Sequence, residues 1–333
     1  MNEKRLKISA VLPAYNSAER IGRTIQSVLS QNRPPDEIVV VNDGSTDRTS
    51  QVVRSFGKRV KLIEQQNQGA SAARNAGIKA AEGDWIAFLD SDDEWLERHL
   101  ESQERILLEN PFLVWSAANH INNLESENKS FPFTDPAAAK EILNGKDYHQ
   151  SYFRAFRKQA TGCTDTVVIK RDVLFESGLF REQQKIANDL DMWFRIAHKY
   201  PSIGYSPEPA AIYHLDAEWS ISRRLCTIEE FSDLLRRHIK LAQEAGSLEA
   251  FSEHIGWQVP AWCRASLFDK RAYQVRQFAK QFSDYLPAWK YFVIMTLTIN
   301  PGLTMKALRA ISRVVRKTGL RKRAVRPPKR IDE

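Results

Sequence analysis

The first hundred residues alternate short β-branched runs with segments of helical periodicity. Residues 8–12, 37–41, 60–63 and 85–89 are apolar runs typical of buried strands, and the segments between them place apolar residues at helical spacing. Strands that alternate with helices form βαβ units around a mostly parallel sheet. The pattern therefore predicts an α/β fold.

The composition is that of a folded chain. Of its 333 residues, 42% are hydrophobic and 27% are charged, which excludes disordered, collagen-like and mucin-like proteins. The three cysteines, Cys163, Cys226 and Cys263, are odd in number and widely spaced, so we expect neither a disulfide framework nor a zinc site. No secretory signal precedes the first strand, and no apolar run approaches the roughly 20 residues of a membrane span. We therefore expect a cytoplasmic protein.

The net positive charge of the chain comes almost entirely from its C-terminal segment. The chain carries 49 basic and 41 acidic residues, and the segment 301–333 alone holds 4 Lys and 7 Arg against two acidic residues. Apolar residues recur at helical spacing from 303 to 315, preceded by Trp289, Tyr291 and Phe292. This pattern predicts that residues 303–330 bind an anionic membrane surface at the inner face of the cell membrane. The alternative is a packed helix with a solvated end. No RNA-binding motif accompanies the charge, so we expect no nucleic-acid partner.

The pattern changes along the chain. After Trp95 it becomes mixed, with helices expected at 96–109 and 188–200, a strand at 166–170 and little structure at 131–136. Beyond Ser222 the alternation of strand and helix stops, and residues 227–285 read as helices. A module boundary is therefore expected near 222–226.

Acidic and polar residues follow the predicted strands. Asp90, Asp92 and Asp93 come after the run 85–89, and Asp43 follows the run 37–41. The carboxyl ends of parallel strands share one edge of the sheet, where ligands bind in α/β proteins. Clustered carboxylates suit Mg²⁺ or Mn²⁺, which also takes oxygens from a diphosphate. The alternative is a solvated turn with Asp93 capping a helix that begins near Trp95.

Four motifs stand in order along the N-terminal part of the chain. They are Pro-Ala-Tyr-Asn at 13–16, Val-Val-Asn-Asp-Gly-Ser-Thr-Asp at 40–47, Asn-Gln-Gly-Ala-Ser-Ala-Ala-Arg-Asn at 67–75 and Phe-Leu-Asp-Ser-Asp-Asp-Glu-Trp at 88–95. With these motifs the chain closely resembles the family 2 glycosyltransferases of the GT-A fold over about residues 6–222. The resemblance implies a GT-A catalytic domain at 1–222, with a nucleotide-binding half at about 6–95 and an acceptor-side half at about 96–222. A helical region at 223–300 and a basic tail at 301–333 would follow it.

The resemblance also implies the activity. It is the metal-dependent, inverting transfer of a sugar from a nucleotide-diphosphate donor, with UDP favoured, to a hydroxyl of a carbohydrate or lipid-linked acceptor. Assembly of a cell-surface polysaccharide or glycolipid is the expected setting. A Gln-x-x-Arg-Trp motif, typical of processive synthases in this family, is not found, which favours transfer of a single sugar. The alternatives are a catalytically impaired sugar-nucleotide-binding protein and a nucleotidyltransferase.

The resemblance assigns roles to matching residues. The divalent cation, Mg²⁺ or Mn²⁺, would be held by Asp92, with His214 as a further contact. Asp90 would face the ribose, and Arg74 lies in a stretch that lines the donor pocket. The full set of expected nucleotide-binding residues is Pro13, Ala14, Tyr15, Asp43, Arg74 and Asp90.

The general base is expected in the downstream run Asn-Asp-Leu-Asp at 188–191. A base must remove the acceptor hydroxyl's proton during displacement at the anomeric carbon, and a carboxylate suits this task. We assign the role to Asp189 and keep Asp191 as a rival, because Asn188 stands where the family usually has Glu. On a helix the two aspartates point about 200° apart, so both cannot face one acceptor. An acid-rich helix N-terminus without a catalytic role is the alternative.

Overall fold

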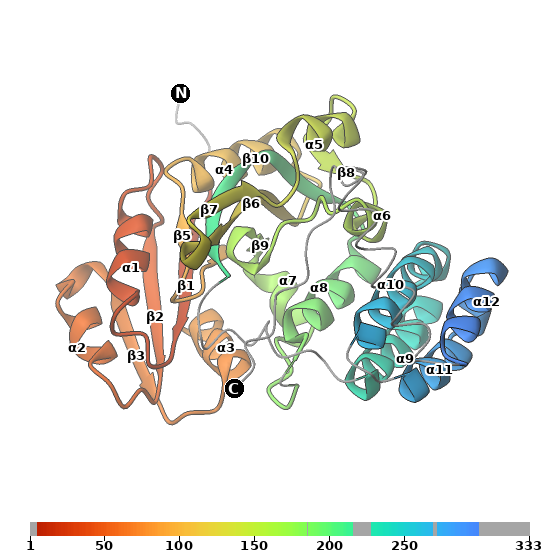
Figure 1. Ribbon diagram of the computed structural model, residues 1–333. Helices are drawn as coiled ribbons and strands as arrows, with labels where there is room; N and C mark the ends of the chain where they lie inside the picture. The colour runs from red at the N-terminus through yellow and green to blue at the C-terminus, as the bar shows by residue number, and fades with distance from the viewer. Residues whose placement is uncertain (1–4, 185, 216–227, 269–271, 300–333) are drawn as a thin grey trace. The chain divides into compact units, whose positions relative to one another are not determined.

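The computed structural model describes residues 5–184, 186–215, 228–268 and 272–299 (Figure 1). It divides into two compact units, Met1–Ile221 and Ser222–Glu333. The predicted membrane-binding segment 303–330 lies outside the described residues.

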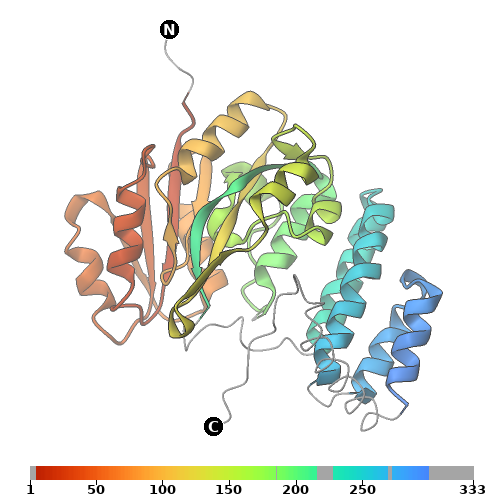
Figure 2. The ribbon, with the colours of Figure 1, turned by 45° about the horizontal axis from the view of Figure 1, so that its top comes forward.

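One mixed sheet runs through the N-terminal unit, in the order β3-β2-β1-β4-β9-β6-β10-β5, with β7 beside β6 and β8 beside β10. The first four strands of this order are mutually parallel. β9 is antiparallel to both of its neighbours. The long strands β6 and β10 are parallel to each other and lie side by side (Figure 2). The strands are β1 (Ile8–Ala14), β2 (Glu37–Asp43), β3 (Lys61–Gln65), β4 (Trp85–Phe88), β5 (Glu94–Trp95), β6 (Trp115–Leu124), β7 (Lys129–Pro132), β8 (Tyr148–His149), β9 (Val168–Lys170) and β10 (Ile203–His214). The predicted α/β fold with a mostly parallel central sheet is confirmed.

Helices connect the strands of this unit. They are α1 (Ile21–Leu29), α2 (Thr49–Arg54), α3 (Ala70–Ala80), α4 (His99–Glu109), α5 (Pro136–Leu143), α6 (Tyr152–Arg157), α7 (Arg171–Glu176) and α8 (Asn188–Lys199). Single turns of 3-10 helix form η1 (Gly57–Arg59), η2 (Glu125–Glu127) and η3 (Thr164–Thr166). α3 lies close to β1 and β2 because it carries Gly77, where a Cβ atom would collide with the side chain of Val11.

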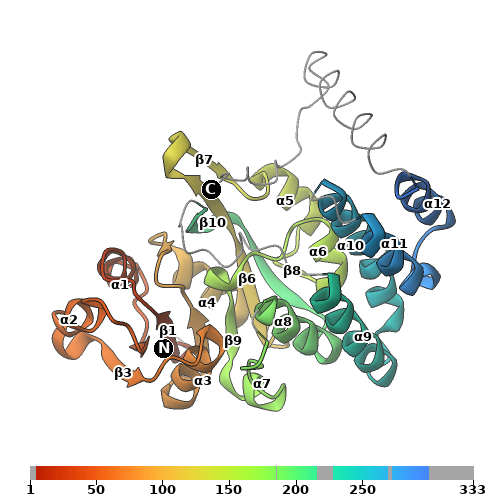
Figure 3. The same cartoon turned by 60° about the horizontal axis from the view of Figure 1, so that its bottom comes forward.

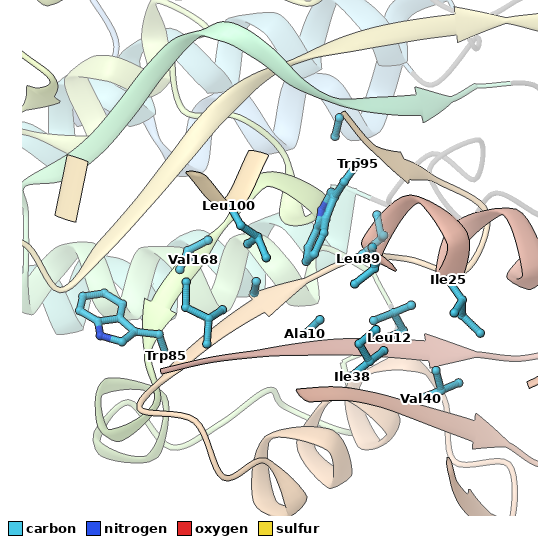
Figure 4. Close-up of a cluster of buried hydrophobic side chains, with 14 of the residues drawn as sticks. Ala10, Leu12, Ile25, Ile38, Val40, Trp85, Leu89, Trp95, Leu100 and Val168 are labelled. Carbon is cyan, nitrogen blue, oxygen red and sulfur yellow. The ribbon is translucent and has the colours of Figure 1, made fainter. Parts of the chain in front are cut away.

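The main hydrophobic core lies between the parallel strands and the helices α1 and α4 (Figure 4). Ile21, Ile25 and Val28 recur at helical spacing on α1 and are fully buried. They pack against the alternate side chains of β1 that include Ala10 and Leu12. This packing fixes where the strands end, and so fixes the edge of the sheet that carries the acidic residues.

The region after Trp95 differs from the expectation. The helix predicted at 96–109 begins only at His99, because Glu94 and Trp95 form β5 and pair with β10. Asp93 therefore does not cap that helix. Residues 131–136, expected to have little structure, end β7 and begin α5. Asp135 caps α5, because its carboxylate accepts hydrogen bonds from the backbone N–H groups of Ala137 and Ala138. Pro136 occupies the first turn of this helix.

The two long strands β6 and β10 were not predicted. β6 reads WSAANHINNL, and its polar residues hide the strand pattern. Asn119 is fully buried there, and its amide donates hydrogen bonds to the backbone oxygens of Thr134 and Pro207. A buried polar side chain with such partners costs little, so the strand tolerates it.

The C-terminal unit is helical in its described part (Figure 3). It contains α9 (Ile228–Glu244), α10 (Leu248–Phe268), α11 (Ala272–Gln281), the 3-10 turn η5 (Ser283–Tyr285) and α12 (Ala288–Leu297). This confirms the predicted helical region that follows the sheet. Among the described residues of the whole chain, no helix combines the length and the apolar character needed to cross a bilayer.

Candidate active site

Hydrogen bonds join the loops that follow β1, β2 and β4. After β1, the Asn16 N–H donates to Ser45 Oγ at 2.9 Å, and Asn16 Oδ1 accepts from the Thr46 N–H at 2.8 Å. The hydroxyl of Ser17 lies 2.7 Å from that of Ser91 in the acidic loop after β4. The three predicted strand ends are therefore one connected surface. Tyr15 lies on it and is 50% exposed, whereas Pro13 and Ala14 are buried at the end of β1.

Asp43 ends β2 and is only 2% exposed. Its carboxylate accepts hydrogen bonds from Gln65 Nε2 at 2.7 Å and from the backbone N–H groups of Gln68 and Gly69 at 2.9 and 2.7 Å. These contacts hold the loop that leads into α3. Three internal donors leave little of the carboxylate's accepting capacity for a ligand.

Arg74 and Asp90 form a salt bridge between α3 and the acidic loop. The guanidinium nitrogen NH2 lies 2.5 Å from Asp90 Oδ1, and the Arg74 side chain is 7% exposed. Burial acts to lower the pKa of Arg74, but the charge of Asp90 and, less strongly, that of Asp189 outweigh it, so the pKa lies above its ordinary value. The Nε atom of Arg74 is buried and has no hydrogen-bond partner. Arg74 thus interacts electrostatically with both Asp90 and the predicted base, Asp189.

Asp92 is half-buried in the same loop. Burial raises the pKa of its carboxyl group, and the charge of Asp90 raises it further, while Arg20 and His214 oppose the rise. Two neighbouring carboxylates that repel each other fit a divalent cation, which takes one or two carboxylates and completes its shell with water and phosphate oxygens. Among the described residues, no group of three or more His, Cys, Asp or Glu side chains is arranged to hold a metal ion.

Asp93 and Asp165 lie beneath the acidic loop, and each is 1% exposed. Asp165 Oδ1 accepts a hydrogen bond from the Asp90 N–H at 2.8 Å. Burial and the charge of Asp90 raise the pKa of Asp165 to about 7, although a hydrogen bond with Asp93 opposes the rise. Burial raises the pKa of Asp93 well above its ordinary value. Burial therefore favours the neutral form of both carboxyl groups.

His214 ends β10 beside the acidic loop. Its backbone N–H donates to Asp93 Oδ1 at 2.7 Å. Its Nε2 lies 3.0 Å from Glu94 Oε1, and its Nδ1 lies 3.1 Å from Glu125 Oε1. Both ring nitrogens of His214 therefore have carboxylate partners in this structure. Glu94 also pairs with Arg23, with Nε and Oε1 3.1 Å apart.

Asn188 and Asp189 begin α8. The Asn188 amide donates to Ser71 Oγ on α3 at 2.8 Å, and its Oδ1 accepts from the Asp189 N–H at 2.8 Å. The Asp189 carboxylate is half-buried, accepting from the Leu190 N–H at 2.8 Å and from Thr164 Oγ1 at 3.4 Å. Asn188 therefore fixes the start of α8 against α3, where Arg74 lies.

Asp191 has a different environment from Asp189. Its side chain is 1% exposed, and its Oδ2 lies 3.1 Å from Arg181 Nε and 2.9 Å from Arg195 Nε. A buried carboxylate held by two guanidinium groups is part of the packing between α8 and the loop before it.

Sequence reasoning missed Asp165, Thr164 and Arg20. Asp165 and Thr164 belong to η3, which leads into β9. Because β9 is antiparallel to β4, the residues before β9 lie at the same edge as the residues after β4. Reading the predicted strand at 166–170 as antiparallel would have pointed to both residues.

The chain is similar to known glycosyltransferases. The family model for glycosyl transferase family 2 matches residues 9–176, about half of the chain. An uncharacterized glycosyltransferase of Rickettsia prowazekii is 29% identical over 236 residues, covering 70% of this chain and 71% of the relative. The putative teichuronic acid biosynthesis glycosyltransferase TuaG of Bacillus subtilis is 38% identical over 106 residues, or 31% of this chain and 42% of TuaG. The matched region spans between 28% and 58% of four other Rickettsia relatives.

Solved structures share the fold. S. aureus TarS residues 1–349, crystallised in complex with UDP-GlcNAc, superposes with a TM-score of 0.66 at 18% identity, covering 95% of this chain and 92% of that one. GalNAc-T7 with UDP, GalNAc and Mn²⁺ superposes with a TM-score of 0.57 at 15% identity, covering 78% and 58%. With the family match over residues 9–176, this likeness identifies the chain as a GT-A-fold member of glycosyl transferase family 2.

Proposed function

We propose that this chain transfers a single sugar, with inversion, from a UDP-sugar to a hydroxyl of a carbohydrate or lipid-linked acceptor. The observation that carries the proposal is the position of Arg74, which is salt-bridged to Asp90 and lies within the electric field of Asp189. One buried cation thereby connects the nucleotide side of the site with the candidate base. Assembly of a cell-surface polymer is the proposed setting, supported by the relative named for teichuronic acid biosynthesis.

The proposed donor lies along the ends of β1, β2 and β4. Tyr15 offers an exposed ring on which a base can stack, next to Pro13 and Ala14. Asp43 shapes the adjoining loop through its three hydrogen bonds, and its carboxylate keeps one accepting position for the nucleobase of the donor. Asp90 faces the ribose and is oriented by Arg74 and by the Asp165 carboxyl group.

Asp92 is the proposed ligand of a divalent cation, Mg²⁺ or Mn²⁺, with His214 next to it. The half-buried carboxylate beside Asp90 fits this role, because the two negative charges repel each other in the unliganded chain. When bound, such a cation stabilises the charge that develops on the leaving diphosphate. The structure of GalNAc-T7 with Mn²⁺ supports a metal in this fold.

Asp189 is the proposed general base. It stands in the first turn of α8, where the helix dipole favours negative charge, and its side chain is half-buried. Thr164 and the Leu190 N–H orient its carboxylate, leaving accepting positions for an acceptor hydroxyl. The burial of Asp191 between Arg181 and Arg195 supports Asp189 over its rival. A base within hydrogen-bond reach of the hydroxyl contributes about 10² to 10⁴ in rate.

The donor is tested by thermal stabilisation. Purified full-length protein is heated with UDP, GDP and dTDP sugars, each with Mn²⁺, with Mg²⁺ or with EDTA. We expect UDP-sugars to raise the melting temperature in the presence of a metal, because a ligand that binds only the folded form stabilises it. Stabilisation by GDP- or dTDP-sugars instead of UDP-sugars would overturn the assignment of UDP as the donor nucleotide. Equal stabilisation in EDTA would overturn the proposed role of a divalent cation in donor binding.

A further inference from the structure

Exposed apolar side chains concentrate on α12. In the described part of the chain, eight large hydrophobic side chains are exposed, and four of them lie between residues 289 and 299. Trp289 is 66% exposed, Phe292 70%, Val293 43% and Ile299 71%. The first three recur at i, i+3 and i+4, so they share one face of the helix. We call Trp289, Phe292, Val293 and Ile299 the apolar stripe.

The opposite face of α12 is packed inside the C-terminal unit. Ile294 and Thr298 are 5% and 8% exposed. Lys290 Nζ donates to the Gly256 oxygen of α10 at 3.0 Å, and Arg276 of α11 donates to the Met295 oxygen at 3.5 Å. α12 lies beside α11 at the edge of this helical group (Figure 3). The helix is therefore held in place with its apolar stripe facing outward.

Positive charge follows the stripe in the sequence. Residues 291–305 carry no charged side chain, and residues 306–330 then carry all 11 Lys and Arg of the C-terminal segment. An exposed aromatic stripe followed in the sequence by a strongly basic segment matches the boundary of a lipid bilayer, where rings lie at headgroup depth and cations pair with anionic headgroups.

We propose that the α12 stripe is a docking surface for an anionic lipid bilayer. The binding is peripheral: Trp289, Phe292 and Val293 enter the headgroup region. The net positive charge of the C-terminal sequence favours an anionic surface over a neutral one. A second copy of the chain is a poorer occupant of the stripe. It would bring together two C-terminal segments that each carry 11 basic and two acidic residues, and these would repel each other. The proposal does not depend on the catalytic assignments.

The test uses full-length protein and sedimentation with vesicles. One set is phosphatidylcholine alone, and the other is equal parts phosphatidylcholine and phosphatidylglycerol. The variant Trp289→Ser/Phe292→Ser removes two rings of the stripe. The matched control, Phe112→Ser/Phe175→Ser, removes two rings that are 58% and 40% exposed in the N-terminal unit. Light scattering of each protein without vesicles gives its oligomeric state, and the melting temperature checks its fold.

We expect the wild type and the control to bind the anionic vesicles, more weakly at high salt, and to bind pure phosphatidylcholine little. The stripe variant should lose at least about tenfold in affinity for the anionic vesicles. Equal binding by the stripe variant and the control would overturn the proposal, because the rings of the stripe would then contribute nothing to the affinity for the vesicles. A wild-type dimer that the stripe substitutions dissociate would also overturn it.

Discussion

Two groups of carboxylates in the N-terminal unit differ in how the protein satisfies them. The outer group, Asp90, Asp92 and Asp189, is half-buried. The inner group, Asp93, Asp165 and Asp191, is at most 1% exposed. Inner carboxylates are held by protons, arginines or backbone N–H groups of the chain itself. Aspartates that are close in the sequence thus differ in their surroundings: the inner ones are satisfied within the fold, and the outer ones are partly exposed.

Loss of Asp92 should give the largest effect on activity. We expect Asp92→Ala to abolish sugar transfer, because the proposed cation site disappears. Its melting temperature should stay near that of the wild type or rise, since one of two repelling carboxylates has been removed. A transfer assay with a UDP-sugar and a calorimetric scan check both results. Asp172→Ala, at an exposed carboxylate on α7, is the control and should keep full activity.

Substitution of Asp189 compares the two aspartates of α8 directly. Asp189→Asn should lower turnover by on the order of 10² or more and leave donor binding unchanged, because only the proton acceptor is lost. Asp191→Asn should keep turnover per folded molecule within about tenfold of the wild type. Single-turnover kinetics and donor titration measure the two quantities. Full activity in Asp189→Asn would remove Asp189 from the role.

Removal of the inner carboxylate on α8 should instead affect stability. Asp191→Ala leaves Arg181 and the largely buried Arg195 without their shared partner. Breaking such a buried pair costs about 3–5 kcal/mol of unfolding free energy. Urea unfolding followed by tryptophan fluorescence measures this loss, with Asp189→Ala as the matched variant that should change stability far less. Equal losses in the two variants would contradict the division into inner and outer groups.

The raised pKa of Asp165 should make stability depend on pH. The Asp165 carboxyl group keeps its proton up to a pKa of about 7 in the folded chain, against an ordinary value of 3.8. In this window the folded state binds more protons than the unfolded state, so the contribution of Asp165 to stability falls as pH rises. Asp165→Asn has no such proton to lose. Its unfolding free energy relative to the wild type should therefore rise between about pH 4 and about pH 8 in EDTA. A constant difference would contradict the raised pKa.

The parallel half of the sheet was predictable because its signals are local. The apolar runs of β1, β2 and β4 are almost wholly buried, and each leads into a motif of the family. β6 was missed because polar residues such as Asn119 interrupt its pattern, and the Asn119 amide finds its partners in distant segments. β10 was missed because Pro207 and Pro209 interrupt its run. Sequence spacing cannot reveal such partners.

The candidate site shows the same limit. Asp90, Asp92 and Asp189 were named from motifs, whereas Asp165 was not, because its role depends on an antiparallel strand that brings residue 165 to residue 90. The partners of Asp191 show why it is a weaker candidate base than Asp189. Only one of the two, Arg195, lies on the same helix, at i+4. Helical periodicity alone gave the direction of Asp191 but not its surroundings.

The central claim is that the outer carboxylates form a metal-dependent site for a nucleotide diphosphate. Its most direct test is a crystal of the full chain soaked with UDP and Mn²⁺ and measured at the manganese absorption edge. The account predicts an anomalous peak within coordinating distance of Asp92 and of the diphosphate oxygens, with the uracil ring of UDP beside Tyr15. A bound UDP whose diphosphate and manganese lie away from Asp92 would contradict it.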